Sequence, residues 1–488
     1  MTSRTFWTFF ALAAALRIWG IWLPQFWYDE NFTLIISRLP FERMIAATAG
    51  DVHPPLWYLI TWTITQALPA APPWVLRLPS VLFSLGSLIV FYLVMREMRI
   101  PDKVQLGAML IMVLVPMQVW YAQEARMYAL LQFLVLFSLL FALRGHWLGL
   151  FVTSALLLYT QNYGAFYLAA IGLVILIRDW RSVPYAAVAI GLAGAAYLPW
   201  VHVLASQMDA INGRYWIQDN GIGDALNILY KLFWASSMPG FAILSAMLVT
   251  FAAISVGLLH MAHDRHSAKW TILVMAFAPL LFGWVVTVLW QPVLLHRPLI
   301  GIAPYLYIVA AWSLSRLFEG EQVRVQREAV ISAAMVIPIF VSGIGGYYRN
   351  IPKMKNDGAV SPLIGTLDYV RQHWQDGDII VYADDGPMIN LHPYAGDLPQ
   401  YLIPACGDRL SSGPVLGSLT NATRDAIGIP RIGIDQIHGR AWVFAPFSPL
   451  HPQCYEEYIA PITPGDPLLV VDDNQYIYSG VWLIGEEE

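Results

Sequence analysis

Residues 123–144 read QEARMYALLQFLVLFSLLFALR. A polar group of Gln, Glu and Arg is followed at once by a mostly apolar run, which ends at Arg144. A helix that spans a bilayer needs roughly 20 mostly apolar residues. The stretch therefore predicts a membrane-spanning helix near 127–144 that carries ionisable residues at its beginning.

The composition of the whole chain agrees with this interpretation. Of its 488 residues, 57 % are hydrophobic and 12 % are charged, whereas soluble globular proteins have about 25 % charged residues. This excludes a soluble enzyme, a disordered chain and a nucleic-acid-binding protein. The net charge of −5 is small, and no basic tail is present that would bind a polyanion. The 20 Trp and 24 Tyr residues fit aromatic belts at membrane interfaces.

Ten further apolar runs bring the number of predicted spans to eleven. They lie near 5–24, 77–95, 104–121, 146–160, 163–178, 184–201, 240–260, 270–290, 299–316 and 329–347. Arg17 interrupts the first run, and no small-x-small cleavage site follows it. We therefore interpret this run as an uncleaved anchor rather than a signal peptide.

The stretch 54–68 is also apolar, but it is short and could be either a twelfth span or an interfacial helix. The positive-inside rule decides between these readings. If 54–68 does not cross, the cytoplasmic side holds Arg4, Arg96, Arg99, Lys103, Arg144, Arg178, Arg181, Arg265, Lys269, Arg316, Arg324 and Arg327. If it does cross, all later cations move outside. We therefore expect eleven spans, with the N-terminus in the cytoplasm. We expect them in the inner (plasma) membrane, because the first span starts almost at once and no retention signal is seen.

Two domains are predicted. Residues 1–347 form a transmembrane domain, whose first outer loop, 25–76, holds interfacial helices. Residues 348–488 are rich in Pro, Gly and Asp, and they contain a polar helix candidate at 362–375 and strand-like runs at 378–383, 441–445 and 468–473. The predicted fold class is a polytopic α-helical membrane protein with a C-terminal extracytoplasmic α/β domain.

The two cysteines, Cys406 and Cys454, both lie in this C-terminal part. Two cysteines are too few for a disulfide scaffold or a Cys-rich metal site. An oxidising compartment would permit a disulfide between them, and two separate thiols are the alternative.

Five polar clusters remain, and the predicted topology places all five on the same outer side of the membrane. They are YDEN at 28–31, DVHPP at 51–55, YAQEARMY at 121–128, YTQNY at 159–163 and HRP at 296–298. This common location is the strongest functional signal in the sequence.

Asp29 and Glu30 lie between the aromatic pair 27–28 and an amphipathic stretch. They could belong to an ordinary solvated loop. A carboxylate pair at a membrane surface also suits a general base, because one group removes a proton while its neighbour tunes its pKa.

Asp51 and His53 form the second candidate pair. Asp51 could be the N-cap of a helix with Pro in its first turn, which would leave His53 facing the site. A metal site formed by Asp29, Asp51 and His53 is an alternative, although the spacing matches no standard ligand motif.

Glu124 and Arg126 lie where the fourth span begins. Ionisable residues at membrane depth are costly and are usually paired or functional. The two could form a structural pair, or the guanidinium could hold a phosphate, which its geometry suits well. His296 and Arg297 offer a second cation at the same level. Asn162 is a weaker candidate, because neutral polar groups often only join helix ends.

The clusters together resemble a known family. Asp29-Glu30, His53-Pro-Pro, QEARMY at 123–128 and Tyr-Thr-x-Asn-Tyr-Gly at 159–164 resemble glycosyltransferase family 39 and its GT-C membrane relatives. These relatives include protein O-mannosyltransferases and lipid A aminoarabinose transferases. The resemblance covers about residues 1–345 and is carried mostly by the first 165 or so. At Gln161 this chain departs from the family, which often has His there.

The resemblance implies a hexosyl- or pentosyltransferase that inverts the anomeric carbon. A sugar would move from a polyprenyl-phosphate donor to a lipid, glycan or protein acceptor on the extracytoplasmic side, in cell-surface glycan or glycolipid assembly. Asp29 would deprotonate the acceptor hydroxyl, and Glu30 would orient or hold the acceptor. The substrate and lipid phosphate would be bound by His53, Gln123, Glu124, Arg126, Tyr128, Asn162, Tyr163, His296 and Arg297. No cofactor is required, because phosphate leaves readily; a divalent metal held by Asp51 and His53 stays a weak alternative.

Two other classes of protein fit less well. A transporter or flippase usually places ionisable residues near the bilayer midplane, often in repeated halves; here the clusters lie at span ends and no repeat is visible. A non-enzymatic membrane scaffold would leave the five clusters unexplained. The glycosyltransferase is therefore the favoured hypothesis.

Overall fold

The computed structural model describes residues 2–23, 25–211, 222–235, 240–263, 266–315, 362–383, 385–403, 421–446, 463, 466–473 and 477–485. Their contacts divide them into two compact units. Unit 1 comprises the described residues of Met1–Ile21, Arg77–Val201 and Ile217–Arg349, and unit 2 those of Trp22–Leu76, His202–Trp216 and Asn350–Glu488. The predicted domain boundary at 347–348, the span predicted at 329–347, Cys406 and Cys454 lie outside the described residues.

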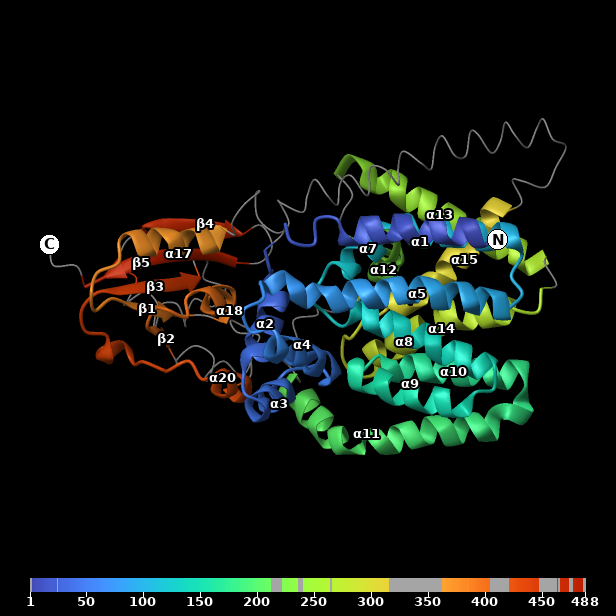
Figure 1. The fold of residues 1–488 in the computed structure, drawn as a ribbon, viewed down its shortest axis with the longest axis horizontal. Coiled ribbons are helices and arrows are strands. Elements are labelled where there is room, and N and C mark those ends of the chain that lie inside the picture. Colours follow the sequence, from blue (N-terminus) through green and yellow to red (C-terminus); the bar gives the residue numbers. More distant parts are fainter. Residues whose placement is uncertain are drawn as a thin grey trace. The chain divides into compact units, whose positions relative to one another are not determined.

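Unit 1 is helical (Figure 1). Its helices are α1 (Ser3–Ile18), α5 (Leu78–Glu97), α6 (Asp102–Leu114), α7 (Pro116–Ala122), α8 (Tyr128–Leu143), α9 (Trp147–Thr160), α10 (Gly164–Arg178), α11 (Val183–Ile211, whose last turns group with unit 2), α12 (Ile222–Trp234), α13 (Gly240–His263), α14 (Lys269–Leu289) and α15 (Ala303–Ser315), with 3₁₀ turns η2 (Trp180–Ser182) and η3 (Ile300–Ile302). Each predicted span from 5–24 to 299–316 overlaps one of these helices, or two in the case of 104–121.

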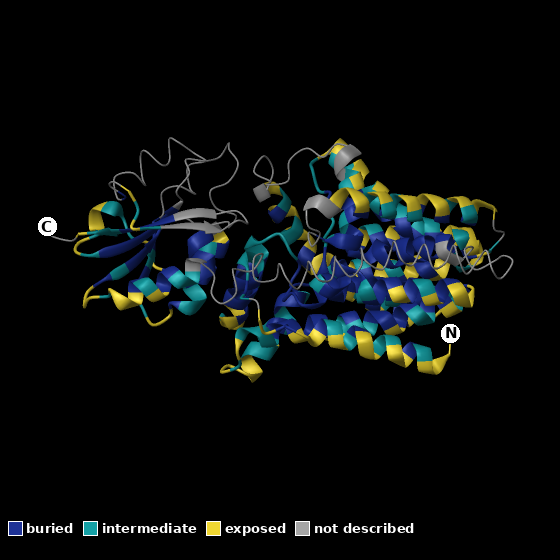
Figure 2. Ribbon diagram, turned by 90° about the horizontal axis from the view of Figure 1, so that it is seen from above, coloured by how far each residue is buried: buried dark blue, intermediate teal, exposed yellow. Residues whose placement is uncertain are grey.

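The helices of unit 1 suit a lipid environment. By length and composition, four helices in the described part of the chain are able to cross a membrane, or five if the bent pair α6–α7 is one span. Large apolar side chains such as Leu82, Leu148 and Val188 are exposed on these helices, while the buried residues gather between them (Figure 2). The total of eleven spans stays a prediction.

The span predicted at 104–121 is not one straight helix but two helices with a break between them. α6 and α7 are bent by 52°, and Val115 between them has extended backbone angles. The cause is Pro116, which has no N–H to donate and disfavours the helical conformation of the residue before it.

Arg17 donates to the carbonyls that this bend exposes. Its Nη2 lies 2.9 Å from the carbonyl oxygen of Met112 and its Nη1 lies 3.4 Å from that of Val113. Its Nε donates to Ser84 Oγ at 2.8 Å, and the side chain is fully buried. The charged side chain of Arg17, in the first span, therefore satisfies backbone carbonyls at the break between α6 and α7.

Conversely, a residue at the end of α7 caps the C-terminal end of α1. Gln123 Nε2 lies within hydrogen-bond distance of the carbonyl oxygens of Leu16 (3.1 Å), Arg17 (3.1 Å) and Trp19 (2.7 Å). These carbonyls belong to the last turn of α1, which ends at Ile18 rather than at the predicted residue 24. α1 and the α6–α7 segment thus cap each other.

α12 was not predicted from the sequence. Its 13 residues are too few to span a bilayer, and Asp224, Asn227 and Lys231 interrupt its apolar residues. The helix contacts α7 and α13, and Tyr307 of α15 donates to the carbonyl of Leu232 at 2.8 Å.

Unit 2 contains a five-stranded sheet with the order β2-β1-β3-β5-β4. Its strands are β1 (Ile379–Tyr382), β2 (Gln400–Leu402), β3 (Ala441–Pro446), β4 (Leu469–Asp473) and β5 (Ile477–Ile484). β1 pairs in parallel with β2 and β3, and β5 pairs antiparallel with β3 and β4. The runs expected at 378–383, 441–445 and 468–473 coincide with β1, β3 and β4. β2 and β5 were missed, because one is only three residues long and Ser479-Gly480 interrupts the other.

The remaining elements of unit 2 are short helices. They are α2 (Tyr28–Arg38), α3 (Phe41–Gly50), α4 (Leu56–Ala67), α17 (Pro362–Gln372), α18 (Asp385–Leu391) and α20 (Asn421–Ile427), with 3₁₀ turns η1 (Pro73–Arg77), η5 (His392–Tyr394) and η6 (Ile434–Gln436). α17 coincides with the polar helix expected at 362–375. α4 has 12 residues, or about 18 Å at 1.5 Å per residue, so it is too short to cross a hydrocarbon core of about 30 Å.

The N-cap predicted at Asp51 is wrong. Asp51 is the C-cap of α3, and its N–H donates to the carbonyl of Thr48 at 3.1 Å. α4 begins later, with Pro55 at its N-cap and no side-chain cap. The Asp51 carboxylate instead accepts a hydrogen bond from Tyr58 at 3.0 Å, which draws it toward α4.

We expect Arg17→Leu to lower the free energy of unfolding by about 3 kcal/mol, because it leaves buried carbonyls without their charged donor. Thermal unfolding of the purified protein in detergent measures this loss. Arg4→Leu is the matched control, since Arg4 is also in α1 but is exposed. Equal unfolding temperatures for the two variants would contradict the capping role.

Candidate active site

Two of the polar clusters meet directly in unit 1. Tyr121, at the end of α7, lies with its hydroxyl 3.3 Å from Nε2 of His296. The Tyr121 ring also packs edge-on against Tyr128, with centroids 5.0 Å apart. The clusters at 121–128 and 296–298 therefore form one polar region between α7, α8 and the loop that precedes α15.

A third cluster joins this region through tyrosine hydroxyls. The hydroxyl of Tyr163 donates to the carbonyl of Val293. One turn further along α10, the Tyr167 hydroxyl donates to the carbonyl of Pro298 at 2.8 Å and accepts from the N–H of Gly301 at 3.1 Å. A Cβ at Gly301 would lie 2.7 Å from the Tyr167 ring, so this close approach requires glycine. The loop that carries His296 and Arg297 is thus tied to α10 at both ends.

Positive charge gathers around His296. Burial lowers the pKa of His296 well below its usual value, and the charges of Arg297 and Lys231 lower it further. The imidazole is therefore neutral at pH 7. Lys231 was missed by the sequence analysis, although a single Lys in the apolar run 225–234 was a visible signal.

Glu124 and Arg126 are both buried in the link between α7 and α8. Ser80 of α5 donates its hydroxyl to the backbone oxygens of Glu124 at 2.6 Å and Arg126 at 3.2 Å. The N–H of Arg126 also donates to the Glu124 carbonyl at 2.8 Å. The backbone of this link is therefore held in a defined shape. Burying ionised side chains is costly, which fits a functional role.

Gln123 and Asn162 have visible structural roles. The Gln123 amide nitrogen is committed to the end of α1, as described above. The Asn162 N–H donates to Gln161 Oε1 at 2.7 Å, and its Oδ1 accepts from the Tyr197 hydroxyl at 3.4 Å. These contacts join helix ends, so a role of Gln123 or Asn162 in binding substrate stays a prediction.

The predicted carboxylate pair lies in unit 2, in the first turn of α2. The N-terminus of a helix carries partial positive charge, which stabilises carboxylates there. Glu30 is fully buried, whereas Asp29 is partly exposed. Of the two, Asp29 is therefore the carboxylate better placed to reach an acceptor.

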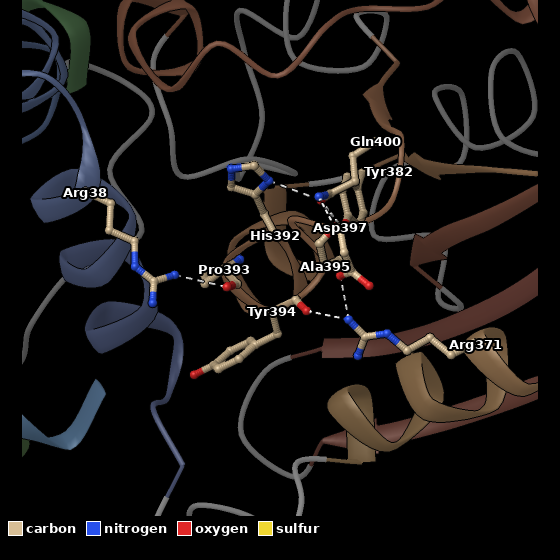
Figure 3. A network of polar contacts seen from close by, with 9 residues as sticks. All are labelled: Arg38, Arg371, Tyr382, His392, Pro393, Tyr394, Ala395, Asp397 and Gln400. Carbon is tan, nitrogen blue, oxygen red and sulfur yellow. Dashed lines mark hydrogen bonds and ion pairs between the residues drawn. The ribbon is translucent and has the colours of Figure 1, made fainter. Parts of the chain in front are cut away.

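Asn31 connects the beginning of α2 to distant parts of unit 2. Its Nδ2 donates to the carbonyl of Phe26 and to Oδ1 of Asn390, each at 3.0 Å. Its Oδ1 accepts from the Tyr394 hydroxyl at 3.0 Å. Figure 3 shows Tyr394 in the network that follows α18.

The cluster at 51–55 lies beside α2 in the same unit. The ring of Phe32 on α2 meets the ring of Tyr58 edge-on at 6.2 Å, and Tyr58 donates to Asp51. Among the described residues, no group of three His, Cys, Asp or Glu side chains is arranged to hold a metal ion. Asp29, Asp51 and His53 thus form no such group, and the need for a metal stays untested.

The structure therefore brings three of the five clusters together in unit 1 and the other two together in unit 2. A single site formed by all five clusters stays a prediction.

We expect the stability of the protein to fall as the pH drops below about 6.5, the usual pKa of His. The pKa of His296 is lowered on folding, so the unfolded chain binds more protons below this pH. His392 adds to this effect, because burial and the charge of Arg38 lower its pKa. Thermal unfolding at pH 7.5 and 5.5 should show a smaller loss in His296→Gln than in the wild type. His263→Gln, at an exposed position of α13, is the control and should keep the wild-type loss.

Comparison with solved structures identifies proteins with a similar fold. No protein-family model and no curated protein matches the chain. Among solved structures, ArnT from Cupriavidus metallidurans in the apo state has 13 % identity and a TM-score of 0.61, over 99 % of this chain and 98 % of that chain. The same protein bound to undecaprenyl phosphate has 13 % identity and a TM-score of 0.60, over 98 % and 97 %. The oligosaccharyltransferase AglB from Archaeoglobus fulgidus, in complex with an inhibitory peptide and a dolichol-phosphate, has 12 % identity and a TM-score of 0.51, over 77 % and 58 %.

At identities of 12 to 13 %, the structural similarity establishes the fold of this chain but not its activity. The similarity to ArnT extends over almost the whole of both chains, unit 2 included. It agrees with the resemblance that the polar motifs indicated. The chain is a mostly helical, multi-pass membrane protein with the fold of the GT-C membrane glycosyltransferases.

Proposed function

We propose that this chain is an inverting glycosyltransferase of the inner membrane that uses a polyprenyl-phosphate-linked hexose or pentose. The acceptor is a lipid, glycan or protein hydroxyl on the extracytoplasmic side, in the assembly of cell-surface glycans or glycolipids. Eleven spans with a cytoplasmic N-terminus and a C-terminal extracytoplasmic α/β domain belong to this proposal.

One observation carries the proposal. In a chain with the GT-C fold, the charges of Arg297 and of Lys231 on α12 act on His296. His296 and Arg297 lie in a loop that α10 holds by Tyr163 and Tyr167. Cations near the ends of membrane helices suit an anionic headgroup whose tail stays in the lipid. A phosphate ester on a long prenyl chain has this chemistry.

The solved neighbours support the choice of donor. ArnT was crystallised with undecaprenyl phosphate and AglB was solved with a dolichol-phosphate. Both ligands combine a polyprenyl chain with a phosphate. We extend this shared chemistry to the present chain, whose cationic loop is able to bind it.

In the proposed reaction, Asp29 accepts the proton of the acceptor hydroxyl. The hydroxyl oxygen then attacks the anomeric carbon, and the bond between that carbon and the phosphate oxygen breaks with its electron pair going to the phosphate. Attack from the face opposite the leaving group inverts the configuration. Arg297 and Lys231 stabilise the charge that develops on the leaving phosphate.

The other predicted residues complete this assignment. Glu30 is buried in the same helical turn as Asp29, and we assign it to orienting the base rather than to contacting the acceptor. Arg126 is the third cation for the phosphate, and Tyr128, the first residue of α8, is assigned to substrate binding with it. His53 and Asn162 are assigned to substrate binding. We assign no cofactor, because phosphate leaves readily once cations neutralise its charge.

We expect Asp29→Asn to lower the rate of sugar transfer at least 100-fold, as loss of a general base commonly does. The measurement is transfer from short-chain polyprenyl-phosphate sugars by the purified protein in detergent. Donor binding, followed separately by thermal stabilisation, should be kept. Glu42→Gln is the matched control, since it changes an exposed carboxylate in the first turn of α3. Wild-type protein that neither binds nor uses any donor would overturn the proposed function.

We expect Arg297→Gln and Lys231→Gln each to raise the KM for the donor roughly 10-fold, since each removes a charged contact worth about 1.4 kcal/mol. Arg144→Gln, which breaks the exposed ion pair with Glu97, should leave this KM unchanged. Unchanged KM values in both loop variants would show that the phosphate binds elsewhere.

A further inference from the structure

α2, whose first turn contains Asp29 and Glu30, is attached at both ends to one distant segment of unit 2. At its beginning, Asn31 is hydrogen-bonded to Asn390 and Tyr394. At its end, Nη1 of Arg38 donates to the carbonyl of Pro393 at 3.0 Å (Figure 3). Asn390, Pro393 and Tyr394 follow one another within five residues, at the end of α18 and in η5.

The contacts of Asn31 fix the first turn of α2. Its side chain is 1 % exposed. Both hydrogens of its amide nitrogen have acceptors, in Phe26 and Asn390, and its oxygen has a donor in Tyr394. Asn31 follows Glu30 directly. An amide held from three directions therefore determines where the carboxylate pair points.

The segment around η5 is itself held firmly by a glutamine. Gln400 Nε2 donates to the carbonyl of Ala395 at 2.6 Å. Its Oε1 accepts from the Tyr382 hydroxyl at 2.8 Å and lies 3.1 Å from His392 Nδ1. The same residue thus ties the turn after α18 to strands β1 and β2.

An arginine holds the turn from the other side. Nη2 of Arg371 donates to the carbonyl of Tyr394 at 2.9 Å and to Oδ1 of Asp397 at 2.7 Å. The hydrogen bond from Arg371 lowers the pKa of the Asp397 carboxyl. Tyr394 therefore reaches α2 from a backbone that Arg371 and Gln400 fix.

The beginning of α18 is anchored by a buried ion pair. Arg424 of α20 contacts both carboxylate oxygens of Asp385, at 2.9 and 2.8 Å, and the two side chains are only 10 % and 2 % exposed. Such two-pronged pairs are geometrically demanding. Both ends of the segment 385–394 therefore have their own supports, and α2 rests on a rigid element.

We propose that Asn390 and Tyr394 are positioning residues for catalysis, which act through Asn31 to aim the Asp29–Glu30 pair. This inference rests on the proposed function, in which Asp29 is the base. Displacing a reacting group by about 1 Å can cost 100-fold in rate, so hydrogen bonds that set the direction of one helical turn have a direct effect on the chemical step. The C-terminal part of the chain would then contribute to turnover without contacting the substrate.

The test compares Tyr394→Phe and Asn390→Leu with the wild type in the donor assay. Each substitution removes one hydrogen bond to Asn31 and keeps the size of the side chain. We expect kcat to fall roughly 10-fold to 100-fold, while the KM and the binding affinity for the donor stay within about two-fold. Arg431→Gln is the control: it breaks the exposed ion pair with Asp425 in the same unit and should leave kcat unchanged.

The outcomes separate this inference from the proposed function. Turnover by the wild type that Asp29→Asn abolishes, with wild-type kcat in both Asn31-contact variants, would overturn the positioning role alone. A kcat that falls only together with donor affinity and unfolding temperature, in both variants, would also overturn it, because the residues would then serve folding only. No turnover and no donor binding by the wild type would remove the proposed function and this inference with it.

Discussion

The reciprocal capping of α1 and the α6–α7 break is the interaction on which unit 1 depends. Hydrocarbon supplies no hydrogen bonds, so every backbone group inside the membrane needs a partner in the protein. Arg17 donates to the carbonyls released by Pro116, and Gln123 donates to the last carbonyls of α1. One consequence is that the link 123–127 has a fixed course, which sets the backbone positions of Glu124 and Arg126.

The two groups of polar clusters, one in each unit, are stabilised by different means. In unit 1, tyrosine hydroxyls of α7 and α10 hold the loop of His296 and Arg297 by contacts with its backbone and its imidazole. In unit 2, the carboxylates of α2 are aimed by side chains that lie about 360 positions further along the chain. In the first arrangement, the charges of Arg297 and Lys231 act on His296. The second fixes the direction of a negatively charged pair.

Much of the helical order was predictable from the sequence, because the length of apolar runs is a local property. α8, α9 and α10 differ from their predicted spans by no more than one residue at either end. The failures have physical causes. Pro116 breaks the apolar run at 104–121 into two helices. Asp51 ends α3 instead of beginning α4. α12 is too short and too polar to be recognised as a membrane helix, so Lys231 was not among the predicted site residues. The motifs predicted candidate site residues, but they did not predict the contacts that these residues make.

What the sequence by itself determined is the membrane class of the chain, the position of most helices and the polar clusters at their ends, since these depend on composition and periodicity along the chain. Only the tertiary structure decided that Gln123 serves α1, that Lys231 joins His296 and Arg297, and that Asn390 and Tyr394 reach Asn31. Such contacts join residues far apart in sequence. They are set by the packing of whole helices and strands, for which neither residue type nor local spacing carries information.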